Sequence, residues 1–291
     1  MGKKNLIIGG CTNYGINQLK PWVLSINEHM PDAKKVMVVG NASSETRGWL
    51  VEQGFEVVDM PQAQIPVHVL RFVGIYEYLR KHWQEFEYVI TTDVKDVYFQ
   101  SDAFKFLDYH NIGVRDMNQI VAASESICYK DESWGNENLM QCYGPYIHDL
   151  FKDNEIYNVG VLAGNAEYIK DLVFNIFTNA INRPIPIVDQ AVFNVLIQTQ
   201  PFKDVTMFTD QRSGWAVQLG TTGDPSKIAG FRPNLLEPEP VFNYEDSLIQ
   251  TALNFRTVCI VHQYDRVPEW KKLVEKKYQQ EDQSDYVVIR T

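Results

Sequence analysis

Short apolar segments alternate with longer amphipathic segments along the first half of the chain, and this alternation constrains the fold more than any other feature. The apolar runs predict buried strands, and the segments between them carry apolar residues at helical spacing. The predicted strands are residues 6–8, 36–39, 55–58 and 88–90, and the predicted helices are residues 18–30, 43–53 and 67–82. Alternating strands and helices are typical of a parallel sheet flanked by helices, so we expect an α/β fold.

The second half of the 291-residue chain has a less regular pattern. Residues 210–256 are rich in glycine, proline, asparagine and aspartate, which predicts an irregular C-terminal part. Elsewhere the pattern predicts strands at 120–123, 159–162 and 258–261, helices at 169–182 and 188–197, and a charged helix or tail from 269. No segment is typical of a linker, so we predict a single domain over residues 1–291, with halves at about 1–125 and 126–268 and a C-terminal helix or tail at 269–291.

The formal net charge of −10 limits the ligands that the chain can bind. Nucleic-acid-binding proteins usually carry a basic patch, and no basic run here is longer than a pair, so we expect no nucleic acid partner. A phosphate-bearing ligand would need a metal ion or a local cluster of lysine and arginine to offset repulsion.

The cysteines and the longest apolar stretches give expectations about cellular location. The four cysteines form no C-x-x-C pair, which predicts free thiols: Cys11, Cys128, Cys142 and Cys259. No apolar stretch reaches the length of a signal-peptide core or of a membrane span, so we expect no transmembrane segment. These features predict a cytoplasmic protein, or a catalytic domain expressed without its anchor.

Two aspartates follow the predicted strand at 88–90 and are the most informative residues of the chain. Asp93 and Asp96 stand three positions apart, so they can converge on one ion only if the chain turns after Asp93. Mg²⁺ and Mn²⁺ prefer oxygen ligands and often join one or two carboxylates to substrate phosphates. His262 follows the late strand at 258–261 and is suited to complete such a site. The alternatives are a solvated turn and a structural histidine.

Two further segments carry polar groups that have either a structural or a functional use. Asp189 and Gln190 open the predicted helix at 188–197, where they either cap the helix or point into a sugar pocket. The segment Tyr157–Asn165 contains glycines in a strand-like run, which either mark close approach to a ligand or pack against a helix.

The order of these motifs, over roughly residues 5–265, resembles that of the GT-A glycosyltransferases, which use nucleotide sugars. The resemblance implies the α/β, Rossmann-like GT-A fold, with a mixed, mostly parallel sheet flanked by helices. The best-known acidic motif of that family is Asp-x-Asp, and this chain departs from it because Lys95 stands where the second aspartate would fall. The Asp-x-x-Asp spacing instead resembles the variant in the collagen glucosyltransferase domain of lysyl hydroxylases. In that variant two aspartates and a distant histidine hold Mn²⁺ against the donor diphosphate. The resemblance therefore implies that Asp93, Asp96 and His262 bind Mn²⁺ or Mg²⁺.

The resemblance also implies which parts of the chain bind the two substrates. Residues 1–125 would bind a nucleoside-diphosphate sugar, with a UDP-sugar as the expected donor, and residues 126–268 would bind a glycan or other hydroxyl acceptor. The Asn-x-Gly and Asp-Gln segments are similar to those of the glycogenin-like family, where they line the sugar and acceptor site. Trp215 and Gln218 are further candidates for the acceptor cleft.

Besides Asp93, five residues of the first half are expected to contact the donor. In the loop after the first strand, Thr12 and Asn13 would donate or accept hydrogen bonds and Tyr14 would offer a stacking face to the nucleoside. An ordinary polar turn is the alternative for this loop. Arg71 would reach a phosphate or a donor hydroxyl, or would pair with a neighbouring acid. Lys95 would balance charge near the metal.

The sequence leaves the mechanism and two other function classes open. Asp189 would act as general base in an inverting enzyme, and Asp189 or Gln190 would stabilise an oxocarbenium-like centre in a retaining one; the resemblance favours retention. A sugar nucleotidyltransferase normally has a basic, glycine-rich loop after its first strand, whereas residues 9–15 contain no lysine or arginine. A non-catalytic sugar- or protein-binding domain on the same fold is the other alternative.

Overall fold

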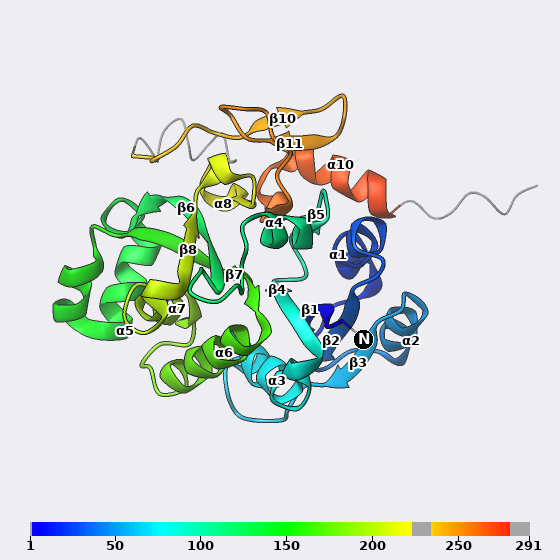
Figure 1. Cartoon of the computed structure of the whole chain (residues 1–291), viewed down its shortest axis with the longest axis horizontal. Helices are drawn as coiled ribbons and strands as arrows, with labels where there is room; N and C mark the ends of the chain where they lie inside the picture. The colour runs from blue at the N-terminus through cyan, green and yellow to red at the C-terminus, as the bar shows by residue number, and fades with distance from the viewer. Residues whose placement is uncertain (1, 223–233, 280–291) are drawn as a thin grey trace, which may run out of the picture.

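A computed structural model describes residues 2–222 and 234–279 of the chain (Figure 1). Its largest element is a seven-stranded sheet with the order β3-β2-β1-β4-β7-β6-β8. The strands are β1 (Lys4–Cys11), β2 (Lys34–Val39), β3 (Glu56–Asp59), β4 (Phe86–Thr92), β6 (Ile120–Cys128), β7 (Glu155–Asn165) and β8 (Thr206–Thr209). Strand β7 is antiparallel to both neighbours, and the other pairings are parallel. The predicted α/β class with a mixed, mostly parallel sheet is confirmed.

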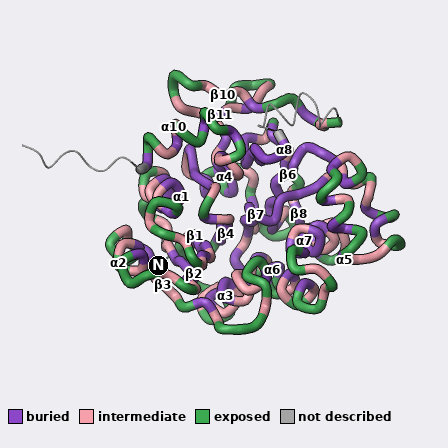
Figure 2. Tube along the Cα trace, turned by 180° about the vertical axis from the view of Figure 1, so that it is seen from behind, coloured by how far each residue is buried: buried purple, intermediate pink, exposed green. Residues whose placement is uncertain are grey.

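Helices cover both faces of this sheet. Leu6 and Ile8 of β1 pack in a core with α3 and α6, whereas Ile7 packs in a second core with α1 and α2. Both faces of the sheet are thus buried at β1, β2 and β4, which is why these strands read as continuous apolar runs (Figure 2). The helices are α1 (Ile16–His29), α2 (Ser44–Glu52), α3 (Val67–His82), α4 (Ala103–Tyr109), α5 (Ser133–Phe151), α6 (Ala166–Ala180), α7 (Asp189–Ile197), α8 (Leu219–Thr222) and α10 (Pro268–Gln279).

The carboxyl ends of β2, β1 and β4 meet at one edge of the sheet, as the strand pattern predicts. Helix α3 lies close to this edge because a glycine faces it. A Cβ added at Gly10 would lie 3.1 Å from Cβ of Arg71. The absence of a side chain at Gly10 therefore lets Arg71 approach the loops that follow the strands.

A smaller sheet completes the fold beside the same edge. It has the order β5-β12-β9 and is formed by β5 (Val97–Phe99), β9 (Ala216–Gln218) and β12 (Ile260–His262). A hairpin of β10 (Val241–Asn243) and β11 (Leu248–Gln250) lies above it, near α10 (Figure 1). Trp270 of α10 is buried and donates a hydrogen bond from Nε1 to the hydroxyl oxygen of Tyr98, at 2.8 Å. The C-terminal segment is thereby joined to the strand that follows the acidic pair.

The structure adds elements that the sequence pattern did not predict. Helix α5 is the longest of them, and its weak pattern has a physical cause: Gly144 has φ 78° and Pro145 follows it, so the helix is kinked. The predicted irregular part at 210–256 contains β9, α8, β10 and β11, while residues 223–233 lie outside the description. The predicted C-terminal helix is described as far as Gln279. Within the described residues, no helix has both the length and the apolar content needed to cross a membrane.

Candidate metal centre

The chain turns between Asp93 and Asp96, as convergence of the two carboxylates requires. Strand β4 ends at Thr92 and β5 begins at Val97, so the turn links the large sheet to the small one. Two contacts hold it: Trp22 Nε1 donates to Thr92 Oγ1 at 2.7 Å, and Val94 packs where a side chain at Gly9 would clash with it. Asp93 and Asp96 therefore lie in the turn that connects the two sheets.

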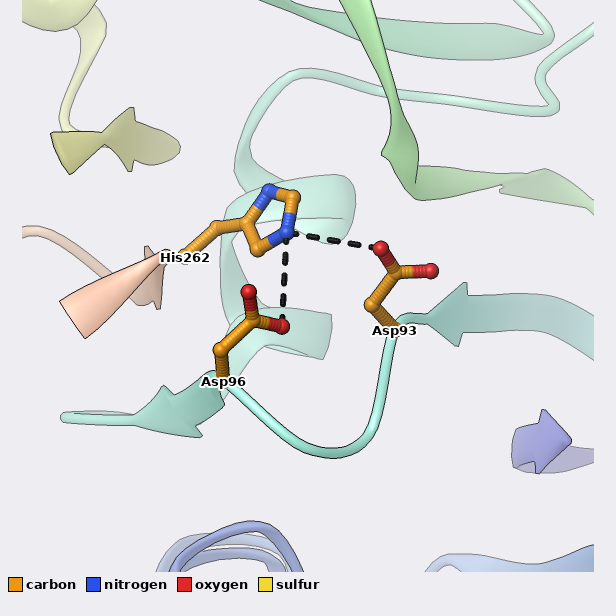
Figure 3. A group of neighbouring side chains, drawn as sticks. All are labelled: Asp93, Asp96 and His262. Carbon is orange, nitrogen blue, oxygen red and sulfur yellow. Dashed lines mark ion pairs between the residues drawn. The ribbon is translucent and has the colours of Figure 1, made fainter. Parts of the chain in front are cut away.

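His262 reaches the same point from the end of β12 (Figure 3). Its Nε2 lies 3.5 Å from Oδ2 of Asp93 and 3.7 Å from Oδ1 of Asp96. One ligand atom from each of the three residues lies within 4.8 Å of the others. Two ligands that are each about 2.1 Å from one ion stand roughly 3.0–3.5 Å apart, so these separations suit a shared ion with small adjustments.

Gln218 fixes the orientation of the imidazole. It lies opposite His262 in the neighbouring strand β9, and its Oε1 is 2.7 Å from His262 Nδ1. Burial lowers the pKa of His262 below its ordinary 6.5, against the opposing effect of Asp96. The neutral ring that donates from Nδ1 to an amide oxygen presents the lone pair of Nε2 to both carboxylates. A lone pair facing two anions is unfavourable unless a cation lies between them, so the donor set fits a divalent metal.

Gly160 of β7 forms the wall of this cluster. A Cβ at this position would lie 2.5 Å from His262 Cε1 and 2.9 Å from Asp93 Oδ2. The backbone also holds the cluster, because Asp93 N donates to the carbonyl oxygen of Gly160 at 2.9 Å. Asn158 accepts a hydrogen bond from Gly160 N at 2.7 Å and donates to the buried Glu125. The Asn-x-Gly segment therefore leaves room for the three candidate ligands.

Arg71 of α3 joins the cluster to helix α7. Its guanidinium pairs with Asp93 Oδ1 through Nη1 and with Asp189 Oδ2 through Nη2, the latter at 3.0 Å. Asp189 is 5% exposed, and its Oδ1 accepts from the backbone N–H of Gln190. Val188, and not Asp189, occupies the N-cap position of α7. Arg71 is thus paired with neighbouring acids, one of the uses that the sequence left open for it, and Asp189 lines the larger cavity without being the N-cap of α7.

Helix α7 is anchored to β7 by one buried amide. Asn194 accepts from Tyr157 N at 2.8 Å and donates to Tyr157 O at 2.7 Å, which reproduces the hydrogen bonds of a neighbouring strand. Asn194 is fully buried. This contact fixes the start of α7, with Asp189 and Gln190, beside the Asn-x-Gly segment.

Two cavities meet at the cluster. The larger, of about 500 Å³, is lined by Asn158, Gly160, Asp189, Gln190 and His262 among others. The smaller, of about 320 Å³, is lined by Thr12, Tyr14, Lys95 and Asp96 among others. Four residues line both: His68, Arg71, Asp93 and Arg266. Three of the four carry nitrogen donors, so the junction offers both cation-binding carboxylates and groups that favour anions.

The predicted donor residues are placed unequally in the smaller cavity. Thr12 and Tyr14 line it, and the exposed Lys95 lies on its wall. Asn13 is not part of its lining; its side chain accepts from Asn41 Nδ2 at 2.6 Å, and its backbone has φ 59°. Burial, followed by the charge of Asp96, raises the pKa of Tyr14. The phenol is therefore protonated at neutral pH and able to donate a hydrogen bond.

Some lining residues carried no signal that the sequence pattern could detect. The larger cavity includes Glu125, Glu132 and Trp134, which lie on β6 and at the start of the unpredicted α5. Trp215, predicted for an acceptor cleft, is instead fully buried against Phe106, with ring centroids 4.9 Å apart. That prediction is wrong because the tryptophan fills the core under β9.

Comparison with known proteins adds no family to these observations. No family model matches the chain, and no curated protein matches it either. The function of the chain is therefore inferred from the residues that line the two cavities.

Proposed function

We propose that the chain is a metal-dependent glycosyltransferase of the GT-A type, which transfers a sugar from a nucleoside-diphosphate sugar to a hydroxyl acceptor. The observation that carries this proposal is the position of the cluster Asp93, Asp96 and His262 at the junction of two cavities. A nucleotide sugar has the same layout: a nucleoside at one end, a sugar at the other and a diphosphate between them. The smaller cavity suits the nucleoside, and the larger suits the sugar and the acceptor.

The charges at the junction support the same assignment. A chain of net charge −10 repels a diphosphate unless local cations offset the repulsion. Arg71 and Arg266 line both cavities, and Lys95 lines the smaller one. Asp93, Asp96 and His262 would hold Mn²⁺ or Mg²⁺, and a bound divalent ion would offset the negative charge that develops on the leaving nucleoside diphosphate.

The residues of this chain have separable tasks in the proposed reaction. Thr12 and Tyr14 contact the nucleoside, and Arg71 and Arg266 orient the phosphates. Asp189 and Gln190 face the sugar from the start of α7. Both oxygens of Asp189 already accept hydrogen bonds, from Arg71 and from the N–H of Gln190, so the carboxylate is fixed beside the sugar. A fixed carboxylate there suits stabilisation of a positive oxocarbenium-like centre, which is the role that the family resemblance gives it in a retaining enzyme.

The experiment that tests the proposal is a thermal-shift screen of UDP, GDP, ADP and CDP, each with and without Mn²⁺. A ligand at 100 times its Kd adds about 2.7 kcal/mol of stability, which is readily seen as a raised Tm. We expect one nucleotide, with UDP favoured, to raise the Tm only with Mn²⁺. The shift should disappear in Asp96→Ala, and turnover of the matching nucleotide sugar should be lost in the same variant.

Other outcomes of this screen point to the other function classes. The same screen extended to nucleoside triphosphates with a sugar phosphate tests the first alternative: stabilisation by that pair, in place of any diphosphate, would identify a sugar nucleotidyltransferase. No shift with any nucleotide, and full activity in excess EDTA, would remove both the donor and the metal assignments.

A further inference from the structure

The larger cavity extends beyond the metal cluster to a half-exposed tryptophan. Trp134, at the start of α5, lines the cavity with 50% of its surface exposed. The indole ring is large and has an apolar face, so its exposed half can stack on a ligand bound in the cavity. Ile187, which is 40% exposed, lines the same cavity from the segment before α7.

Hydrogen bonds hold this apolar wall in place. Glu132 accepts from the backbone N–H groups of Trp134 and Gly135, which fixes the first turn of α5. Asn138, one turn further along α5, donates to the carbonyl oxygen of Ile187 at 2.6 Å. The bond from Asn138 therefore holds the segment of Ile187 against the helix that carries Trp134, and the wall is formed before a ligand binds.

Apart from this apolar wall and the junction residues, the lining of the larger cavity is mostly polar and includes carboxylates. Glu125 is 5% exposed and Asn158 is 4% exposed, and both line the cavity beside the metal cluster. Glu132 adds a second carboxylate near Trp134. The arginines of the lining, Arg71 and Arg266, belong to the junction because they line both cavities. Apart from the junction residues, the described lining of this cavity thus combines an aromatic face with carboxylate and amide groups and contains no lysine or arginine.

We infer that this part of the larger cavity is an acceptor subsite for a neutral saccharide whose ring stacks on Trp134. A pyranose has an apolar face of C–H groups and a rim of hydroxyls, which matches a cavity lined by Trp134 and Ile187 together with Glu125 and Asn158. Carboxylates accept hydrogen bonds from hydroxyls and repel uronic acids, sialic acids and phosphorylated sugars. The inference rests on the proposed function, which supplies the donor sugar at the other end of the same cavity.

The volume of the cavity agrees with two sugar rings. A hexosyl group of about twelve heavy atoms occupies roughly 200 Å³ at the packing density of organic crystals. The larger cavity has about 500 Å³, which holds the donor sugar and one acceptor ring. The acceptor is therefore inferred to present its terminal sugar to the site, with the rest of the acceptor outside.

The test is saturation-transfer NMR on the full chain with a set of neutral mono- and disaccharides and the matching uronic acids. Neutral saccharides should receive saturation from the wild-type protein and from Trp134→Phe, which shows that they bind. Trp134→Ala should bind them about tenfold more weakly. The matched control is Tyr146→Ala, because Tyr146 is an aromatic residue of the same helix that is 76% exposed and lies outside the cavity lining. This control should bind like the wild type.

Three results would overturn the inference: no neutral saccharide binding to the wild type, unchanged binding in Trp134→Ala, or equal binding of the uronic acids. Nucleotide-dependent stabilisation with Mn²⁺, measured on the same proteins, separates this test from the proposed function. Trp134→Ala should retain that stabilisation in full. If the wild type shows this nucleotide-dependent stabilisation but binds no saccharide, only the acceptor subsite is disproved. If the wild type shows no such stabilisation, the proposed function is disproved, whether or not saccharides bind.

Discussion

His262 Nδ1 and Gln218 Oε1 lie 2.7 Å apart across two paired strands, and this contact decides which ring nitrogen faces the two aspartates. The amide oxygen accepts, so Nδ1 carries the proton and Nε2 is left with its lone pair. Both side chains are buried, at 2% and 0% exposure, so water does not compete for the contact. Metal-binding histidines usually have such a partner, and its loss weakens metal binding.

Replacement of Gln218 by leucine should therefore lower the affinity for Mn²⁺ by about 10- to 100-fold. The variant keeps a side chain of similar length but removes the acceptor for His262 Nδ1. Gln218→Glu keeps an acceptor and should recover most of the affinity. Electron paramagnetic resonance titration of free Mn²⁺ measures both variants. Equal loss in the two variants would show that Gln218 is needed only for packing.

Gly160→Ala should abolish Mn²⁺ binding while the protein stays folded. The new methyl group would lie 2.5 Å from His262 Cε1 and 2.9 Å from Asp93 Oδ2, so it pushes two of the three candidate ligands apart. Overpacking of this kind costs about 1–3 kcal/mol of stability. Isothermal titration with Mn²⁺ and urea unfolding measure the two effects.

Gly48→Ala is the matched control for this change. Gly48 lies within α2, and a Cβ there meets no atom within 4 Å. The substitution should leave Mn²⁺ binding unchanged and add about 0.5–1 kcal/mol of stability through helix propensity. Wild-type metal affinity in Gly160→Ala would contradict the placement of the ion.

Arg71→Ala should destabilise the protein in the absence of any ligand, by about 2 kcal/mol, because it leaves the buried carboxylate of Asp189 without its cation. Arg71→Ala combined with Asp189→Ala should recover part of this loss, since neither charge then remains unpaired. A double-mutant cycle in urea gives the coupling between the two residues. Additive effects of the two single changes would show that the ion pair contributes nothing to stability.

The free energy of unfolding should fall between pH 7.5 and 5, in part because His262 is buried. Burial lowers its pKa below the ordinary 6.5, so the folded state binds the proton less readily than the unfolded state. Its contribution to stability is fully present above about pH 6.5 and is lost as the pH falls from there towards the pKa of the folded state. Urea midpoints measured from pH 7.5 to 5 should fall less steeply in His262→Gln than in the wild type. Parallel curves would mean that the ring titrates normally.

The sequence predicts the parts of this structure that rest on local patterns. The apolar runs at β1, β2 and β4 are strands because both faces of the sheet are buried, and their order places the following loops at one edge. Asp93, Asp96 and His262 could be grouped because each follows or ends an apolar strand and their chemistry suits one ion. The metal role itself stays a prediction.

Other parts depend on contacts that no local pattern encodes. Gln218 was predicted for an acceptor cleft, but a three-residue strand, β9, pairs it with His262 instead. Helix α5 was missed because Gly144 and Pro145 interrupt it, and Trp134 was missed with it. The pairing of Arg71 with Asp189 joins residues 118 positions apart, and only the packing of α3 near α7 brings them together.

The candidate ion site lies where the two sheets meet, so its ligands come from segments that are synthesised at different times. Asp93 and Asp96 lie in the first third of the chain, whereas His262 and its strand β12 follow more than half of the sequence later. Chains fold from the N-terminus as they leave the ribosome, and contacts between distant segments form late. A partly synthesised chain thus holds the two carboxylates without the imidazole, and the site can be complete only after β12 has been released and docked. The capacity to bind the ion would then report that β12 has reached its place between β5 and β9.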